Sequence, residues 1–221
     1  MILAAAQSNL LFNWFDVALV LVLGFGFWRG RKNGMAKELL PVFQWLVIVL
    51  AAGLGYELLG SQLIQLGVIK AVFGNAFVLK TAGYITAYLL IAGFAWIMFY
   101  LLKKKLKPKL EGSNLFGSAE YYLGMLAGVV RYACILIFAL ALLNAPYYSS
   151  EEIAAKIAYN NRWYGGGLQG YSGDFIPSLD ELQMTVFRNS LLGPGIKHSL
   201  GGLFIITTGT GPAKPPVVEI Q

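Results

Sequence analysis

The chain has 221 residues, of which 57% are hydrophobic and only 13% are charged, and its formal net charge is +6. That charged share is about half of what an ordinary soluble domain carries. A soluble core of this size could not enclose so much apolar surface, which excludes a water-soluble globular fold and indicates lipid as a second solvent. The single cysteine, Cys134, excludes an internal disulfide.

Four apolar runs predict four helices that cross a membrane. They extend over residues 10–28, 39–59, 82–102 and 122–143. Each run has about 20 residues, which at about 1.5 Å per residue matches a hydrocarbon core of about 30 Å. Lipid offers the backbone no hydrogen-bond partner, so each run is expected to be helical. We therefore expect an all-α membrane protein in which residues 1–144 form a four-helix transmembrane domain.

Two further segments are expected outside the hydrocarbon core. Residues 60–78 are apolar but interrupted by polar side chains, which predicts an interfacial helix between the second and third spans. Residues 145–221 are predicted to form a tail with short amphipathic helices and an extended end. In that tail Ser178 and Glu181 have the spacing of a capping box that opens a helix. The Gly193-Pro194-Gly195 motif is expected to end this helix.

Basic residues concentrate in the loops that join the first span to the second and the third to the fourth. These loops hold nine of the 17 Lys and Arg residues and three acids, so they account for the whole net charge of +6. The basic residues are Arg29, Arg31, Lys32, Lys37, Lys103, Lys104, Lys105, Lys107 and Lys109. The positive-inside rule places these loops in the cytoplasm and both termini outside it. The run over residues 103–109 is interpreted mainly as a topology anchor, with an anionic-lipid or nucleic-acid site as the alternative.

Asp16 and Arg131 are the formally charged residues inside the predicted spans. A charge in lipid costs at least about 2.5–3.5 kcal/mol on insertion scales, so each needs a partner or a role. Three hypotheses stay open: an ion pair between the two, separate satisfaction by water, headgroups or backbone, and a proton or ion pathway.

Small residues recur at helical spacing on two spans. Gly124 and Gly128 form a small-xxx-small step on the fourth span, and Gly24, Gly26 and Gly30 continue the theme on the first. Close approach of backbones is how helices associate in lipid, so these residues predict tight packing within the chain or against another subunit.

Motifs of catalysis are missing from the sequence. It has no P-loop, dinucleotide fingerprint or metal-ligand cluster, and Ser172 does not stand in a Gly-x-Ser-x-Gly motif. We expect a protein that is not an enzyme, with no cofactor, no metal and no nucleic-acid partner. Its 14 Phe, 12 Tyr and 5 Trp residues are typical of anchors at the membrane interface.

A family resemblance rests on residues of the first, second and fourth runs. They are Trp14, Phe15, Asp16, Arg29, Gly30, Gly34 and Glu38, then Leu123, Gly124, Gly128 and Arg131, with a fainter match over residues 190–194. The chain resembles the colicin V production protein (CvpA) family of bacterial inner-membrane proteins. It departs from that pattern at Tyr132, where the family usually has glycine, and at Glu120-Tyr121, where a different polar pair is usual.

The resemblance implies a non-enzymatic inner-membrane scaffold or export accessory, linked to toxin production and export or to envelope homeostasis. Its partners would be the lipid bilayer and a membrane or envelope protein of unknown identity, which includes a second copy of the chain. A small channel or transporter component and a structural subunit of a larger envelope complex are the alternatives.

Overall fold

A computed structural model describes residues 13–65, 76–111, 117–145, 179–187 and 190–205. All regular secondary structure in these ranges is helical, which confirms the all-α expectation. The elements are α1 (Trp14–Gln65), α3 (Ala76–Glu111), η1 (Gly117–Ala119), α4 (Glu120–Leu143), α6 (Leu179–Phe187), α7 (Gly193–Leu200) and η2 (Gly201–Leu203).

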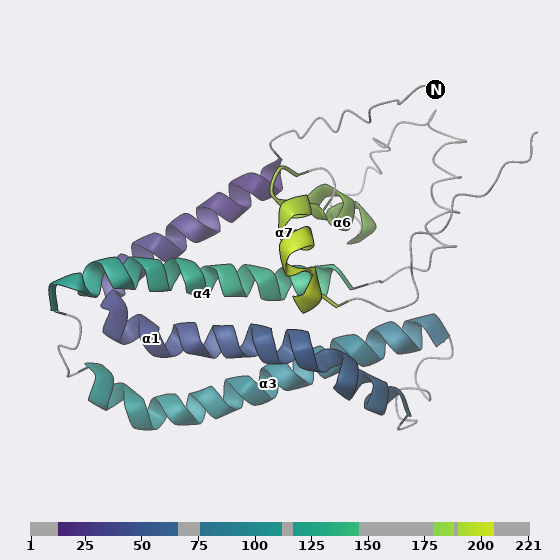
Figure 1. Ribbon diagram of the computed structural model, residues 1–221, viewed down its shortest axis with the longest axis horizontal. Helices are drawn as coiled ribbons and strands as arrows, with labels where there is room; N and C mark the ends of the chain where they lie inside the picture. Colours follow the sequence, from purple (N-terminus) through teal and green to yellow (C-terminus); the bar gives the residue numbers. More distant parts are fainter. Residues whose placement is uncertain (1–12, 66–75, 112–116, 146–178, 188–189, 206–221) are drawn as a thin grey trace, which may run out of the picture.

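Within the described ranges, three helical stretches are long and apolar enough to cross a membrane: Trp14–Gln65, Leu79–Leu106 and Glu120–Leu143. The first belongs to α1, which has 52 residues. A straight helix of that length would extend about 78 Å, more than twice the thickness of a hydrocarbon core. The helix is broken at Gly34, however, and Figure 1 shows its two arms folded back from that point.

The break in α1 depends on glycine. Gly34 has φ 73° and ψ 169°, a conformation that is essentially restricted to glycine. A Cβ atom at this position would also lie only 2.8 Å from the Glu120 Oε1 atom at the start of α4. Sterics therefore fix glycine at the point where the chain reverses between the two arms.

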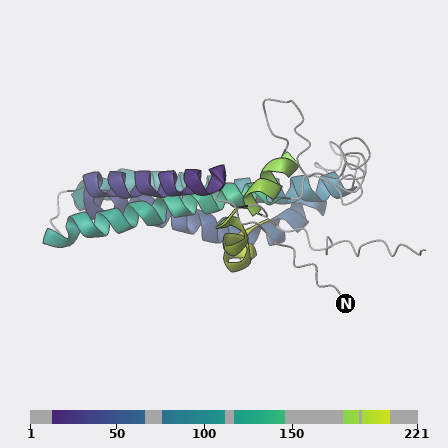
Figure 2. The same cartoon turned by 90° about the horizontal axis from the view of Figure 1, so that it is seen from above.

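The long helices lie lengthwise beside one another and form an elongated bundle (Figures 1 and 2). The buried core includes Ile48 and Ala52 of α1, Tyr88 of α3 and Leu140 of α4. Many large apolar side chains face outward instead, among them Phe94, whose side chain is 70% exposed. An apolar exterior around a small core is the distribution expected when lipid surrounds the helices.

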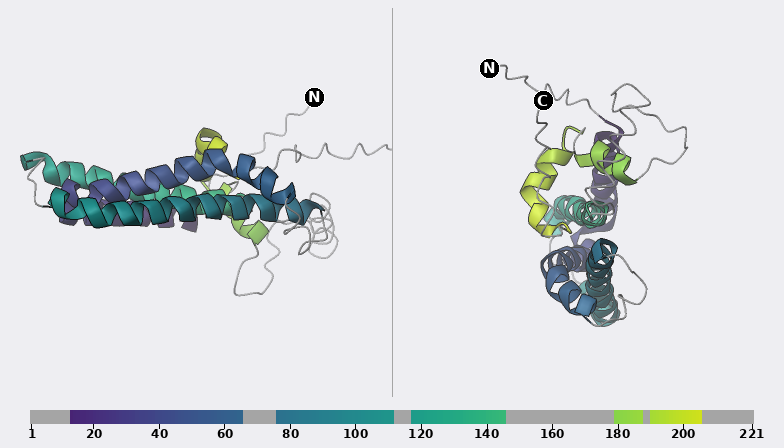
Figure 3. Two further views of the ribbon diagram at one scale, coloured as in Figure 1. Left: turned by 90° about the horizontal axis from the view of Figure 1, so that it is seen from below. Right: turned by 90° about the vertical axis from the view of Figure 1, so that its right-hand side faces the viewer.

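The C-terminal helices pack against the side of this bundle, near the start of α1 and the C-terminal part of α4 (Figure 1). Figure 3 shows α6 and α7 beside α4 and the first arm of α1. Val186, Phe204 and Ile205 are fully or almost fully buried and belong to the same apolar cluster as the long helices. The described part of the predicted tail thus shares the core of residues 13–145.

Two boundaries differ from expectation. Residues 60–65 continue α1, and residues 76–78 belong to α3, while residues 66–75 lie outside the described ranges, so the predicted interfacial helix is not found in the described part of the chain. The helix α6 already ends at Phe187, and Gly193-Pro194 opens α7. Proline suits the first turn of a helix because the N–H group that it lacks would have no partner there.

Candidate functional site

A buried ion pair lies one helical turn beyond the Gly34 break. The Arg131 Nη1 atom donates to Glu38 Oε2 at 3.0 Å, which joins α4 to the second arm of α1. The Glu38 side chain is 1% exposed and that of Arg131 is 20% exposed. The other carboxylate oxygen of Glu38 accepts a hydrogen bond of 2.5 Å from Asn33 Nδ2. Both oxygens of this buried carboxylate are therefore occupied by protein donors.

This geometry corrects the hypothesis of an Asp16–Arg131 pair. Side chains on a helix lean toward its N-terminus, and the N-terminus of α4 lies at the Gly34 end of the bundle. Arg131 therefore reaches Glu38 rather than Asp16, which lies 18 residues, about 27 Å, before Gly34 on α1.

The Asp16 carboxylate binds the start of α7. It accepts hydrogen bonds from the backbone N–H groups of Leu191 at 3.1 Å and Leu192 at 3.1 Å, and from that of Asn13 at 3.0 Å. The side chain is 0% exposed. Asp16 thus stands at the N-termini of two helices, where unpaired N–H groups and the helix dipoles favour a negative charge. Three backbone donors satisfy the carboxylate without a cation.

The turn that presents these donors is built from Ser190 and Gly193. The Ser190 hydroxyl donates to the Val186 carbonyl oxygen at 2.6 Å and accepts from the Gly193 N–H at 2.8 Å. A Cβ atom on Gly193 would lie 1.7 Å from that same carbonyl oxygen, so no larger residue fits. The turn therefore holds the two N–H groups of Leu191 and Leu192 in place for Asp16.

Further hydrogen bonds fasten residues 179–187 and 190–205 to the long helices. The Tyr56 hydroxyl donates to the Phe204 carbonyl oxygen at 3.1 Å, and Asn144 Nδ2 donates to the Ile205 carbonyl oxygen at 3.1 Å. Gln183 Nε2 donates to the carbonyl oxygens of Leu143 and Ala145 at the end of α4. These polar contacts make the C-terminal helices a fixed cap over the start of α1 and the end of α4.

The glycines of α1 and α4 pack against each other. A Cβ atom on Gly30 would lie 2.1 Å from the Gly124 carbonyl oxygen, and one on Gly128 would lie 2.1 Å from the Gly26 carbonyl oxygen. Gly24, by contrast, has no atom within 4 Å of such a Cβ. The structure thus brings Gly124 and Gly128 against Gly26 and Gly30 of the same chain. Tyr132, which departs from the family pattern, packs its ring against Gly26 and Phe25.

The nine basic residues of the two predicted cytoplasmic loops gather at the Gly34 end. Arg29, Arg31, Lys32 and Lys37 flank the break in α1, and Lys103, Lys104, Lys105, Lys107 and Lys109 lie in the last turns of α3. The Lys103 ammonium donates to the buried Gln44 of α1. Asp16 lies in the first turn of α1, beside α7 and away from the Gly34 end, whereas α3 and the second arm of α1 extend further along the bundle than α7 (Figure 1).

A family model for the colicin V production protein matches residues 15–160. The chain belongs to the colicin V production protein family. No curated protein and no solved structure matches it. The matched range contains Asp16, Glu38 and Arg131, whereas the turn around Ser190 lies beyond it.

In the described residues, the Glu38–Arg131 pair and the hydrogen bonds of Asp16 join separate helices. Among the described residues, no three His, Cys, Asp or Glu side chains gather as a metal site would require. Glu38 is the one ion-pair partner that sequence reasoning missed, because it was counted as a charge of the loop. Its position four residues after Gly34, at the edge of an apolar run, was the available signal.

Proposed function

We propose that this chain is a non-enzymatic scaffold or accessory protein of a bacterial inner membrane that serves toxin production and export or envelope homeostasis. The observation that carries the proposal is how the two buried carboxylates are used. Both oxygens of Asp16 and of Glu38 accept hydrogen bonds from protein donors. The donors Arg131, Leu191 and Leu192 connect these carboxylates to α4 and to the start of α7. A catalytic acid or a proton relay needs a carboxylate within reach of substrate or water.

Membership of the colicin V production protein family supports the link to toxin production. The outer surface of the bundle supports a scaffold role. Exposed apolar side chains cover α3, including Phe94, Trp96 and Ile97. These side chains require lipid or the helix of a membrane partner as their neighbour.

Four membrane crossings follow if each arm of α1 crosses once. The first arm, residues 14–33, has 20 residues and would extend about 30 Å, and the second arm is longer. The basic residues at the Gly34 end then lie in the cytoplasm, and both chain termini lie outside it. A reporter that is active only in the cytoplasm should stay silent when fused after Gln221 and be active when inserted after Glu111. A bright fusion after Gln221 would overturn this topology.

Photocrosslinking in native membranes tests the function. A photoreactive amino acid replaces Phe94, which is 70% exposed, and in a matched control it replaces Tyr88, which is 0% exposed. We expect a discrete adduct with an envelope protein, identified by mass spectrometry, from position 94 and none from position 88. Lipid adducts alone at position 94 would contradict the scaffold proposal. A saturable ion flux through vesicles containing the purified protein would favour a channel instead.

A further inference from the structure

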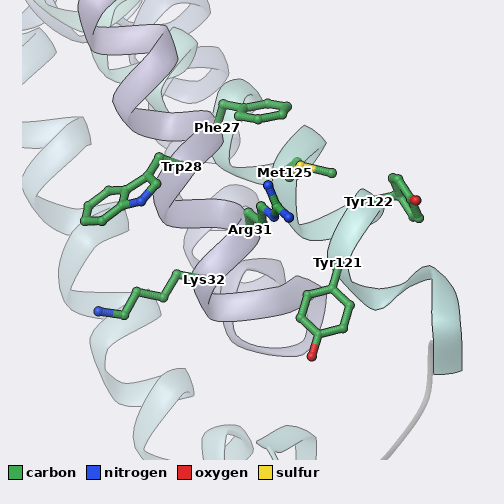
Figure 4. A pocket seen from close by; sticks show the side chains of 7 residues that line it. All are labelled: Phe27, Trp28, Arg31, Lys32, Tyr121, Tyr122 and Met125. Carbon is green, nitrogen blue, oxygen red and sulfur yellow. The ribbon is translucent and has the colours of Figure 1, made fainter.

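We propose that the groove between α1 and α4 at the Gly34 end binds the headgroup of an anionic phospholipid. This open groove of about 760 Å³ is lined by side chains of both helices (Figure 4). Its polar lining is Arg31, Lys32, Tyr121 and Tyr122, and its apolar lining is Phe27, Trp28 and Met125. The inference requires that the chain spans a membrane, but it does not depend on the scaffold role.

The lining is arranged in two layers along the bundle. On α1, Phe27 and Trp28 precede Arg31 and Lys32 by four residues, so that each cation lies one turn nearer the Gly34 end than an aromatic ring on the same face. On α4, which runs in the opposite direction to the first arm, Met125 follows Tyr121 by four residues. On both helices, the apolar side chains of the groove therefore lie about 6 Å further from the Gly34 end than the polar ones.

A phospholipid has the same order of a charged part followed by an apolar part along its length. Its phosphate would meet the cations and the tyrosine hydroxyls, while the first part of an acyl chain would meet the apolar layer. Tyr121 and Tyr122 are 63% and 74% exposed, and large aromatic side chains with a polar atom favour the interfacial region. A topology anchor would need only the charges, and it would not need a groove graded in this way.

The charges of the groove are available for an anion. The Lys32 ammonium lies 5.9 Å above the centre of the Trp28 ring, and Arg31 has no carboxylate among the lining residues. The carboxylate nearest in sequence, Glu120, points at Gly34, with its Oε1 atom 2.8 Å from where a Cβ would stand. Glu38 is occupied by Arg131. The groove therefore carries a positive charge next to an apolar surface, which a two-chain anionic lipid complements.

The test measures lipid binding to the purified full chain in detergent by native mass spectrometry. Phosphatidylglycerol is titrated against the wild type, the R31Q/K32Q variant and a matched control, K104Q/K105Q. The control removes the same charge at the same end of the bundle from exposed residues of α3 outside the groove. We expect R31Q/K32Q to weaken phosphatidylglycerol binding about 30-fold, as the loss of two cationic contacts implies, and the control to change it little.

Several outcomes would overturn the proposal. One is an equal loss of phosphatidylglycerol binding in R31Q/K32Q and in K104Q/K105Q. Another is that the wild type binds phosphatidylcholine as tightly as phosphatidylglycerol. A third is displacement of the lipid by inorganic phosphate at the same concentration, which would indicate a site for a soluble anion. The R31K/K32R variant guards against misfolding, because it keeps both charges and should keep binding within about 3-fold of the wild type. Loss of binding in that variant, with unchanged thermal stability, would also contradict an electrostatic headgroup site.

Discussion

Arg131 of α4 donates to Glu38 of α1 over 3.0 Å, across a boundary between two helices and four residues after the glycine at which α1 reverses. The Arg131 Nε atom is buried and has no hydrogen-bond partner among the described residues, so the guanidinium is held mainly through Nη1. This contact is the single direct ion pair between α4 and the second arm of α1 in the described part of the chain. Glu38 and Arg131 should therefore depend on each other for stability.

Removal of one member of this pair should cost more than removal of both. Glu38→Gln or Arg131→Met alone leaves the other charge without its partner, and each should lower the free energy of unfolding by about 3 kcal/mol. The double variant should recover part of that loss, because no charge is left unpaired. A double-mutant cycle of thermal unfolding in detergent measures the coupling, with the exposed Arg29→Met as control. Strictly additive losses would show that the two residues act independently.

Loss of the Asp16 charge should release the C-terminal cap. Asn at this position has a single acceptor oxygen, whereas the Asp16 carboxylate accepts from three backbone N–H groups. We expect Asp16→Asn to destabilise the protein by about 2 kcal/mol and to expose residues 179–205 to limited proteolysis. The exposed Glu57→Gln is the matched control and should retain wild-type resistance. Wild-type resistance of Asp16→Asn would contradict the capping role.

Alanine at two glycines of the same helix arm should have opposite effects. At Gly24 the new Cβ meets no atom within 4 Å, and alanine favours the helix by up to about 1 kcal/mol over glycine. At Gly30 the new Cβ atom would lie 2.1 Å from the Gly124 carbonyl oxygen, and relieving this clash would require one of the two helix backbones to move. Gly30→Ala should therefore lower the melting temperature while Gly24→Ala keeps or raises it. Equal melting temperatures would rule out close packing between α1 and α4.

The reversal of α1 should tolerate no side chain at Gly34. Asn is the residue that best accepts positive φ after glycine, but it does not adopt φ 73° with ψ 169° without strain. Gly34→Asn should lose about 1–3 kcal/mol from backbone strain, and more from contact with Glu120. Gly117 also has a positive φ of 51°, with nothing within 4 Å of an added Cβ, so Gly117→Asn is the control. Comparable folded yields from both variants in membranes would contradict this account.

The sequence by itself determined the class of the protein and the position of its long helices. Apolar runs of about 20 residues in a chain with 13% charged residues predict helices surrounded by lipid. The sequence suffices for this prediction because the length of each run and the backbone hydrogen bonds of a helix are local properties. The glycines of α1 and α4 were also visible from their four-residue spacing. That they face one another within one chain was one of two alternatives, and the reversal at Gly34 selected it.

The tertiary structure alone decided the partners of the buried charges. Asp16 binds backbone N–H groups 175 and 176 residues further along the chain, and such donors belong to every non-proline residue, so no side-chain pattern identifies them. From its position within the fourth apolar run alone, Arg131 could have paired with a charged residue toward either end of that helix. The lean of helical side chains toward the N-terminus directed it to Glu38, and that direction has meaning only once the helices are placed side by side.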